Sequence, residues 1–328
     1  MNGKTAKRTW LTMLFSLFIY FLASLTFTKV AYDAAFSRYD PPVQVSALPE
    51  LRQQRQSLRF PSGDNLLQGY LYEGSREALV VVVPGYCSGA DDYLQQIRSL
   101  QDYGWGVFAF DPTGSCASGG DSAVGFSQTL CDLDAALDWL ETRGRFGYEK
   151  LLLFGHSRGG YAVCCALALE HEVAAVVSVS GVNSAMEGVL CPVVDRLGPA
   201  AWAGYPLIWM YQTTLFDKSV LEASAARALQ ETQVPVLLVH GSEDGVIPME
   251  AFSVVAHREE ITNPRVRYRI CTDPGQNGHT DLLFDADGSA NDALMEEINA
   301  FYARAAGTTD EREKNDGNCS TDPGLQAG

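Results

Sequence analysis

The chain has 328 residues, of which 46% are hydrophobic and 20% are charged, a composition typical of a globular protein with a sizeable core. Lys and Arg total 24 against 40 Asp and Glu, so the formal net charge is −16. A chain of this charge repels polyanions, which excludes nucleic acid as an expected partner.

The first apolar segment predicts a membrane anchor. Lys4, Lys7 and Arg8 precede the uncharged run from Trp10 to Phe27. This run has 18 residues, which is at the short end of the ~17 to 25 residues that a membrane-spanning helix needs. The basic flank predicts a single-pass membrane protein with its N-terminus in the cytoplasm and the rest of the chain outside it.

Two alternatives to an anchor are a secreted chain whose signal peptide is cleaved and a buried core helix. The run is longer than the usual ~7 to 15 apolar residues of a signal peptide, and the pairs Lys29/Ala31 and Tyr32/Ala34 are poor cleavage contexts. A core helix would show a polar face, and no polar face interrupts this run.

Composition divides the chain into four parts. We expect an anchor over 1–32, a Pro-containing connector over 33–50, a catalytic domain over 51–304 and a polar, poorly ordered tail over 305–328. Inside the domain, an insertion over about 182–232 is twice as long as an ordinary connection between a strand and a helix. We expect it to form a helical lid.

Within the domain, apolar runs alternate with amphipathic helical patterns, which is typical of a mostly parallel sheet flanked by helices. The first two expected strands are joined by a turn at Ser62-Gly63-Asp64 and form an antiparallel pair at one edge. The expected strands are Leu51 to Phe60, Leu66 to Tyr72, Leu79 to Val83, Trp105 to Phe110, Leu151 to Phe154, Ala174 to Val179, Val234 to His240 and Arg265 to Ile270. The expected helices are Asp91 to Tyr103, Ser127 to Arg143, Ser157 to Leu169 and Asp292 to Ala303.

The candidate nucleophile is Ser157, in Gly155-His156-Ser157-Arg158-Gly159, which fits the pattern G-x-S-x-G. The string alone is common by chance. Here an expected strand precedes it and an expected helix follows, as the sharp turn that exposes a nucleophilic serine requires. Flanking glycines relieve the crowding of such a turn, although a glycine-rich turn with an idle serine would look the same.

The candidate general base is His279. A serine hydroxyl is a weak nucleophile near neutral pH, so a base must take its proton and an acid should fix the tautomer of that base. Of the five histidines, only His279 lies in a loop after the last expected strand, from which it can reach over the serine. A surface histidine without a role is the alternative.

The candidate acid is Asp244, which follows a buried strand ending at His240. Asp244 lies between Ser157 and His279 in the sequence, which is the chain order of serine, acid and histidine that follows a G-x-S-x-G turn. Glu243 is the nearest rival, and Asp273 and Asp281 are weaker ones because they flank His279 in sequence rather than facing it.

Negative charge that develops on a substrate oxygen needs preorganised donors. The backbone amide of Tyr86, after the strand that ends in Pro84-Gly85, and the amide of Arg158, at the start of a helix, are the candidates. Pro84-Gly85 would fit a plain turn equally well. In the lid, Trp202, Tyr205 and Trp209 are candidates for an apolar pocket wall, or they only hold the lid on the domain.

Eight cysteines show no paired metal-ligand spacing, and neither CxxC nor HExxH occurs. We therefore expect no metal and no cofactor, and most of the cysteines to be small buried residues.

Taken together, the serine motif, the lid, Val239-His240-Gly241-Ser242-Glu243-Asp244-Gly245-Val246-Ile247-Pro248 and Gly278-His279-Thr280 resemble the α/β-hydrolase superfamily. The likeness is strongest to its serine aminopeptidase, lysophospholipase and carboxylesterase-like branch. It implies the α/β-hydrolase fold, and it implies Asp244 as the acid by position. It also places the loop starting at Asp111 after the fourth strand.

Two positions depart from that branch, which leaves the substrate open. Pro84 stands where His is common, and Thr113 replaces the usual Arg. We expect a serine hydrolase that cleaves small-molecule acyl esters through an acyl-enzyme. The alternatives are an aminopeptidase-like enzyme, for which Glu187, Asp195, Asp217 and Glu222 are candidates to hold a substrate ammonium, and a silent binding protein on the same fold. The family's sheet would also put Cys87 and Cys116 close enough for a disulfide.

Overall fold

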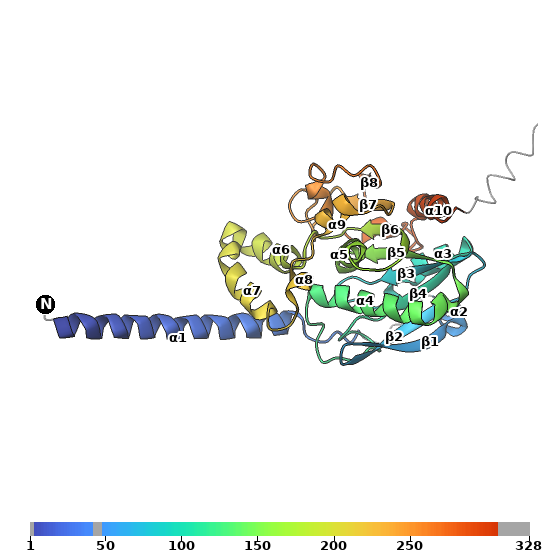
Figure 1. Cartoon of the computed structure of the whole chain (residues 1–328). Coiled ribbons are helices and arrows are strands. Elements are labelled where there is room, and N and C mark those ends of the chain that lie inside the picture. Colours follow the sequence, from blue (N-terminus) through green and yellow to red (C-terminus); the bar gives the residue numbers. More distant parts are fainter. Residues whose placement is uncertain (1–2, 42–47, 308–328) are drawn as a thin grey trace, which may run out of the picture.

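The computed structural model describes residues 3–41 and 48–307 (Figure 1). Its strands are β1 Gln56–Ser62, β2 Asn65–Tyr72, β3 Ala78–Val83, β4 Gly106–Phe110, β5 Lys150–His156, β6 Val173–Val179, β7 Val236–Gly241 and β8 Val266–Cys271. They form one sheet in the order β1-β2-β4-β3-β5-β6-β7-β8. β2 pairs antiparallel with β1 and β4, and the other neighbours are parallel. The expected mostly parallel sheet and its antiparallel edge pair are confirmed.

Helices cover both faces of this sheet. The α-helices of the described residues are α1 Gly3–Ala35, α2 Pro49–Gln54, α3 Leu94–Asp102, α4 Phe126–Thr142, α5 Arg158–Cys165, α6 Ala185–Leu197, α7 Tyr205–Gln212, α8 Lys218–Leu221, α9 Ala225–Glu231 and α10 Asp292–Ala306. The 3₁₀ segments are η1 Ala90–Tyr93, η2 Gly144–Gly147, η3 Ala166–Ala168, η4 Gly198–Gly204, η5 Val254–His257 and η6 Asp281–Leu283.

The sheet separates two apolar cores because successive side chains of a strand point to opposite faces. In β3, Val81 and Val83 lie in the core with α4, α5 and α9, whereas Val80 and Val82 lie in the core with α3 and α10. All of β3 is buried, as expected for a central strand covered by helices on both sides.

Three expectations need correction at element ends. The strand expected from Leu51 begins only at Gln56, because Pro49 opens the short helix α2, where its fixed φ suits the first helical turn. The helix expected from Asp91 begins as the 3₁₀ turn η1. The last helix continues to Ala306, and the rest of the expected tail, 308–328, lies outside the described residues, as do 42–47 of the connector.

The long helix α1 runs past the expected anchor boundary, and its end packs into the domain that contains the sheet. Its apolar part is long enough to cross a membrane, and its side chains from Trp10 to Leu22 are exposed. Tyr32 and Phe36, in contrast, are each only 5% exposed and belong to the core that contains α4 and α5. Arg38 donates hydrogen bonds to three carbonyl oxygens in the loop after β4, those of Cys116, Ser118 and Gly120.

The insertion after β6 is helical and consists of α6, η4, α7, α8 and α9; we keep the name lid for it. Figure 1 shows α7 beside the end of α1, on the side of the domain from which α1 projects. Lys29 and Asp33 form an ion pair on α1, and both contact the hydroxyl of Tyr211 in α7.

Candidate active site

Ser157 lies on a tight turn between β5 and α5. Its φ of 56° and ψ of −117° place a non-glycine residue in a sparsely populated backbone region, which is a common feature of functional sites. The turn is held by the Ser157 amide, which donates to the Val179 carbonyl at 2.8 Å, and by the Tyr161 amide, which donates to the Ser157 carbonyl at 3.1 Å. The serine is thus fixed at the carboxyl end of a central strand.

The flanking glycines are required by close backbone packing. A Cβ on Gly155 would lie 2.3 Å from the Gly159 carbonyl oxygen, and a Cβ on Gly159 would lie 2.1 Å from the Val83 carbonyl oxygen. No side chain tolerates such distances. The pattern G-x-S-x-G therefore reflects the approach of α5 to β3 and β5 here, as expected from the sequence.

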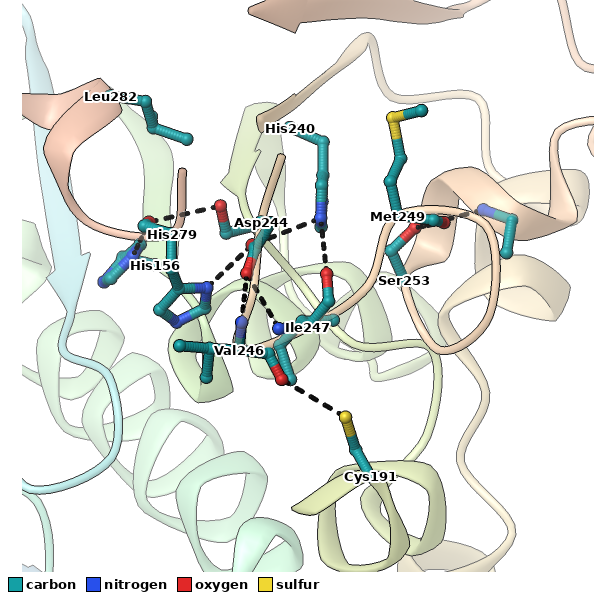
Figure 2. A network of polar contacts seen from close by, with 12 residues as sticks. His156, Cys191, His240, Asp244, Val246, Ile247, Met249, Ser253, His279 and Leu282 are labelled. Carbon is teal, nitrogen blue, oxygen red and sulfur yellow. Dashed lines mark hydrogen bonds and ion pairs between the residues drawn. The ribbon is translucent and has the colours of Figure 1, made fainter. Parts of the chain in front are cut away.

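His279 and Asp244 form a hydrogen-bonded pair, in which Nδ1 of His279 lies 2.8 Å from Oδ2 of Asp244 (Figure 2). The His279 side chain is 12% exposed and the Asp244 side chain is fully buried. Asp244 follows β7 and His279 lies in the loop after β8, so adjacent parallel strands bring the two loops together. A carboxylate at Nδ1 holds the imidazole with Nε2 available as a base.

The surroundings of Asp244 keep it ionised. Burial raises the pKa of this carboxyl, but hydrogen bonds from His240 and His279, together with the Ile247 amide, outweigh burial and hold the pKa well below its usual range. Oδ1 accepts from the amides of Val246 and Ile247 at 2.9 and 2.8 Å. Asp244 is therefore a preformed acceptor for the His279 ring.

The rival acids are placed differently. Glu243, Asp273 and Asp281 are all exposed, and within the described residues His279 has no hydrogen bond to any of their carboxylates. The geometry therefore favours Asp244 among the acids considered from the sequence.

His156 connects the serine turn to the loop of His279, a link that the sequence did not reveal. It directly precedes Ser157, its Nε2 lies 2.9 Å from the His279 carbonyl oxygen, and the two rings are 5.0 Å apart. Between Ser157 Oγ and the His279 ring, both described, there is no direct hydrogen bond.

A second contact of His156 reaches the loop expected to hold the oxyanion. Its Nδ1 lies 2.8 Å from the Tyr93 hydroxyl, which accepts from the Gly85 amide at 2.9 Å. A carbonyl can only accept, so Nε2 of His156 carries the proton and Nδ1 accepts from Tyr93. Burial, with the nearby His279, lowers the pKa of His156 to about 3, so this tautomer is neutral.

The candidate oxyanion donors lie next to the serine. A Cβ on Gly85 would lie 3.3 Å from the Ser157 Cβ, so the Gly85-Tyr86 loop touches the turn that carries Ser157. Within the described residues, the amides of Tyr86 and Arg158 donate to no protein acceptor. The Arg158 side chain is 1% exposed, and its guanidinium donates to the Gly85 carbonyl at 3.4 Å.

The three lid aromatics pack on one another. Trp202, Tyr205 and Trp209 stack on one another, with 6.2 Å between the centroids of each successive pair. The aromatic neighbour of the Tyr86 ring is instead Phe36, at 5.5 Å, from the segment expected to be a connector. Phe36 was missed because nothing in the local sequence signals so distant a contact.

The described residues also include two cysteines near the candidate site and one acidic cluster. Cys87 and Cys116 carry free thiols, so the disulfide implied by the resemblance is absent. Asp138, Glu141 and His171 lie close enough to hold an ion, but Asp138 is exposed and Arg145 pairs with Glu141.

Comparison with known proteins agrees with the fold. A family model described as the alpha/beta hydrolase fold matches residues 78–218. A proline iminopeptidase of Saccharolobus solfataricus is 32% identical over 118 residues, which cover 35% of this chain and only 36% of that relative.

Solved structures of low sequence identity share the fold. An esterase of Pyrococcus furiosus has a TM-score of 0.61 at 19% identity, covering 82% of this chain and 98% of that chain. The Est1E protein of Butyrivibrio proteoclasticus, solved with ferulic acid bound, has a TM-score of 0.57 at 18% identity, covering 76% and 100%. An acylaminoacyl peptidase of Pyrococcus horikoshii has a TM-score of 0.56 at 17% identity, covering 78% and 42%.

Proposed function

We propose that this chain, which belongs to the α/β-hydrolase superfamily, is a membrane-anchored serine hydrolase that cleaves acyl esters. The observation that carries the proposal is the 2.8 Å contact between His279 Nδ1 and Asp244 Oδ2, in loops beside the strained turn of Ser157. A buried, ionised carboxylate on one side of a histidine is what a serine nucleophile needs from its base.

In the proposed reaction, Ser157 Oγ attacks the ester carbonyl carbon while His279 Nε2 takes the hydroxyl proton. Asp244 stabilises the imidazolium that results. The amides of Tyr86 and Arg158 donate to the negative oxygen of the tetrahedral intermediate. His279 then gives the proton to the departing alcohol, and a water molecule hydrolyses the acyl-enzyme by the same steps.

The proposed orientation places the catalytic domain outside the cytoplasm. Lys7 and Arg8 at one end of the apolar run are not balanced by acidic residues, whereas Lys29 at the other end is paired with Asp33. This asymmetry supports a cytoplasmic N-terminus.

An aminopeptidase is the second candidate, favoured by the partial match to a proline iminopeptidase. Such an enzyme needs a lid carboxylate that faces the site. Three of the four lid candidates, Asp195, Asp217 and Glu222, are exposed, and the fourth, Glu187, accepts from Ser184 at 2.8 Å. These placements favour the ester substrate.

Labelling with a fluorophosphonate tests the proposal and also distinguishes it from a silent binding protein. We expect one labelled peptide, containing Ser157, and no labelling of Ser157→Ala. An unlabelled wild-type chain would contradict the proposal. Among substrates, kcat/KM for p-nitrophenyl acetate through decanoate should exceed that for aminoacyl p-nitroanilides, and the reverse order would favour the aminopeptidase. A rise with chain length that Trp209→Ala removes would place that residue in an apolar pocket.

A further inference from the structure

The lid lies on the side of the domain from which α1 projects (Figure 1), and its middle part, residues 197–216, is uncharged and rich in apolar side chains. From Leu197 to Phe216 the chain has no charged residue, although 20% of all residues are charged. Large side chains are exposed along this segment, with Leu197 at 65%, Trp202 at 44% and Met210 at 42%. An exposed apolar surface of this kind marks a contact with a partner or a membrane.

The chemistry of this surface matches the interface of a bilayer. Trp202, Tyr205 and Trp209 form a continuous row, and the rings of Tyr205 and Trp209 are within 7° of parallel. Trp and Tyr concentrate where a membrane meets water, because one end of each ring system is apolar and the other is polar.

The lid surface is also continuous with that of the anchor helix. The Tyr211 ring of α7 lies 5.3 Å from Tyr32 of α1, and its hydroxyl contacts Lys29. Just before this contact, Phe27 and Val30 of α1 are 74% and 62% exposed. The lid therefore lies beside the end of the apolar run, at the level where a membrane-spanning α1 leaves the bilayer.

The same contacts connect this surface to the candidate active site. The Phe36 ring lies 4.7 Å from Tyr32 and 5.5 Å from Tyr86, and the Tyr86 hydroxyl donates to the carbonyl of Ala35. Tyr86 belongs to the loop that touches the Ser157 turn. The end of the anchor, the lid and the oxyanion loop thus form one contiguous group.

We propose that the lid rests in the interfacial layer of the bilayer and that the substrates are acyl esters of membrane lipids, which reach Ser157 from that layer. The substrate class rests on the proposed function, whereas the seating of the lid does not. The chain carries a net charge of −16, and residues 197–216 of the lid carry no charge. Apolar contact rather than charge should therefore hold the lid on the bilayer, and zwitterionic lipid should be sufficient.

Quenching by brominated lipid tests the seating of the lid without any reaction. The full chain with Trp10→Phe is placed in phosphatidylcholine nanodiscs, one copy per disc, and the emission of Trp202 is obtained by subtracting Trp10→Phe/Trp202→Phe. We expect brominated acyl chains to reduce this emission about twofold or more, while the Trp139 emission, obtained in the same way, stays unchanged because Trp139 is buried in α4. Unquenched Trp202, as expected if a second copy of the chain covers the lid, overturns the proposal.

Hydrolysis in the same discs tests the substrate class. The double variant Leu197→Glu/Met210→Glu should lower turnover of palmitoyl lysophosphatidylcholine in the bilayer about tenfold, and turnover of water-soluble p-nitrophenyl butyrate less than about twofold. The matched control is Tyr268→Glu, on β8 and similarly exposed at 37%, which should change neither rate. Equal losses on both substrates overturn the substrate class. Quenching of Trp202 without hydrolysis of either ester would contradict the proposed function. It would still support the proposal that the lid lies in the interfacial layer of the bilayer.

Discussion

Nε2 of His156 lies 2.9 Å from the carbonyl oxygen of His279, so the residue before the candidate nucleophile holds the loop of the candidate base. Through Nδ1 the same ring reaches Tyr93 and, from there, the amide of Gly85. One buried imidazole therefore sets the relative positions of the serine turn, the base loop and the oxyanion loop.

Removal of any member of the proposed triad should abolish most activity. Ser157→Ala, His279→Ala and Asp244→Asn should each lower kcat for an acyl ester by about 10³ or more, because the three groups act as a unit. Glu243→Gln is the matched control, since Glu243 is exposed beside Asp244 and should be silent. A damaging Glu243→Gln with a harmless Asp244→Asn would contradict the choice of acid.

Loss of the His156 link should weaken catalysis without removing the nucleophile. His156→Leu leaves the Tyr93 hydroxyl and the His279 carbonyl without this partner, so we expect kcat to fall about 10-fold to 100-fold. Fluorophosphonate labelling of Ser157 should slow in proportion but remain complete. His171→Leu provides the control for loss of a histidine elsewhere. Full activity of His156→Leu would show that other contacts position the loops.

Stability should fall as the pH is lowered from about 6.5 toward about 3, partly through His156. In the folded protein burial lowers the pKa of this ring to about 3, whereas the unfolded chain binds a proton near 6.5. The unfolded state thus binds more protons in this window, and acid favours it by at most about 1.4 kcal/mol per pH unit. Below about pH 3.8 the unfolded chain also binds a proton at Asp244, whereas the folded carboxyl, with its lowered pKa, stays ionised, and this adds to the loss. The free energy of unfolding, measured with urea at several pH values, should depend less on pH for His156→Asn than for the wild type. Equal slopes for the two proteins would contradict the prediction.

The anchor should remain on the mature protein. Cleavage after Ala31 or Ala34 would separate α1 from the domain or strip Tyr32 from the core. Intact-mass measurement on protein isolated from membranes should therefore give the full-length chain. A shorter chain in the medium that begins near residue 32 would favour the secreted alternative.

The end of the anchor should also contribute to the stability of the domain. Phe36→Ala removes a ring that packs between Tyr32, Tyr86 and Phe126, and should lower the free energy of unfolding by about 3 kcal/mol. Phe27→Ala, at an exposed position of the same helix, is the control and should leave the unfolding of the domain unchanged. Equal effects of the two changes would mean that Phe36 contributes no more than a lipid-facing side chain.

The sequence could predict the sheet and the local geometry at Ser157 because both depend on short-range patterns. Buried runs such as Leu79 to Val83 mark central strands, and the glycines around Ser157 mark the turn. The link from His156 to His279 could not be predicted, because its two residues lie on loops that only the folded sheet brings together.

The segment after the anchor shows a second limit of sequence patterns. Residues 33–50 have the composition of a connector, yet Phe36 is buried and the Tyr39 amide donates to the Gly114 carbonyl at 2.9 Å. Local composition indicates whether a segment can form a hydrophobic core of its own. It does not indicate whether the side chains of that segment pack into the core of a neighbouring domain. The lid illustrates the same limit. The sequence showed that residues 197–216 are apolar, but it did not show that α7 packs beside α1.

The three hydrogen bonds from Arg38 to the loop after β4 have a consequence for the proposed anchoring, because they restrict how the domain can move relative to α1. A domain joined to its anchor by a long flexible linker rotates freely and moves away from the bilayer surface. In the proposed anchored state, the helix α1 passes directly into the domain and Arg38 holds the segment after it, so the same face of the domain should stay toward the bilayer. Molecules that diffuse in the plane of the membrane would then meet the candidate site at a higher effective concentration than molecules in solution.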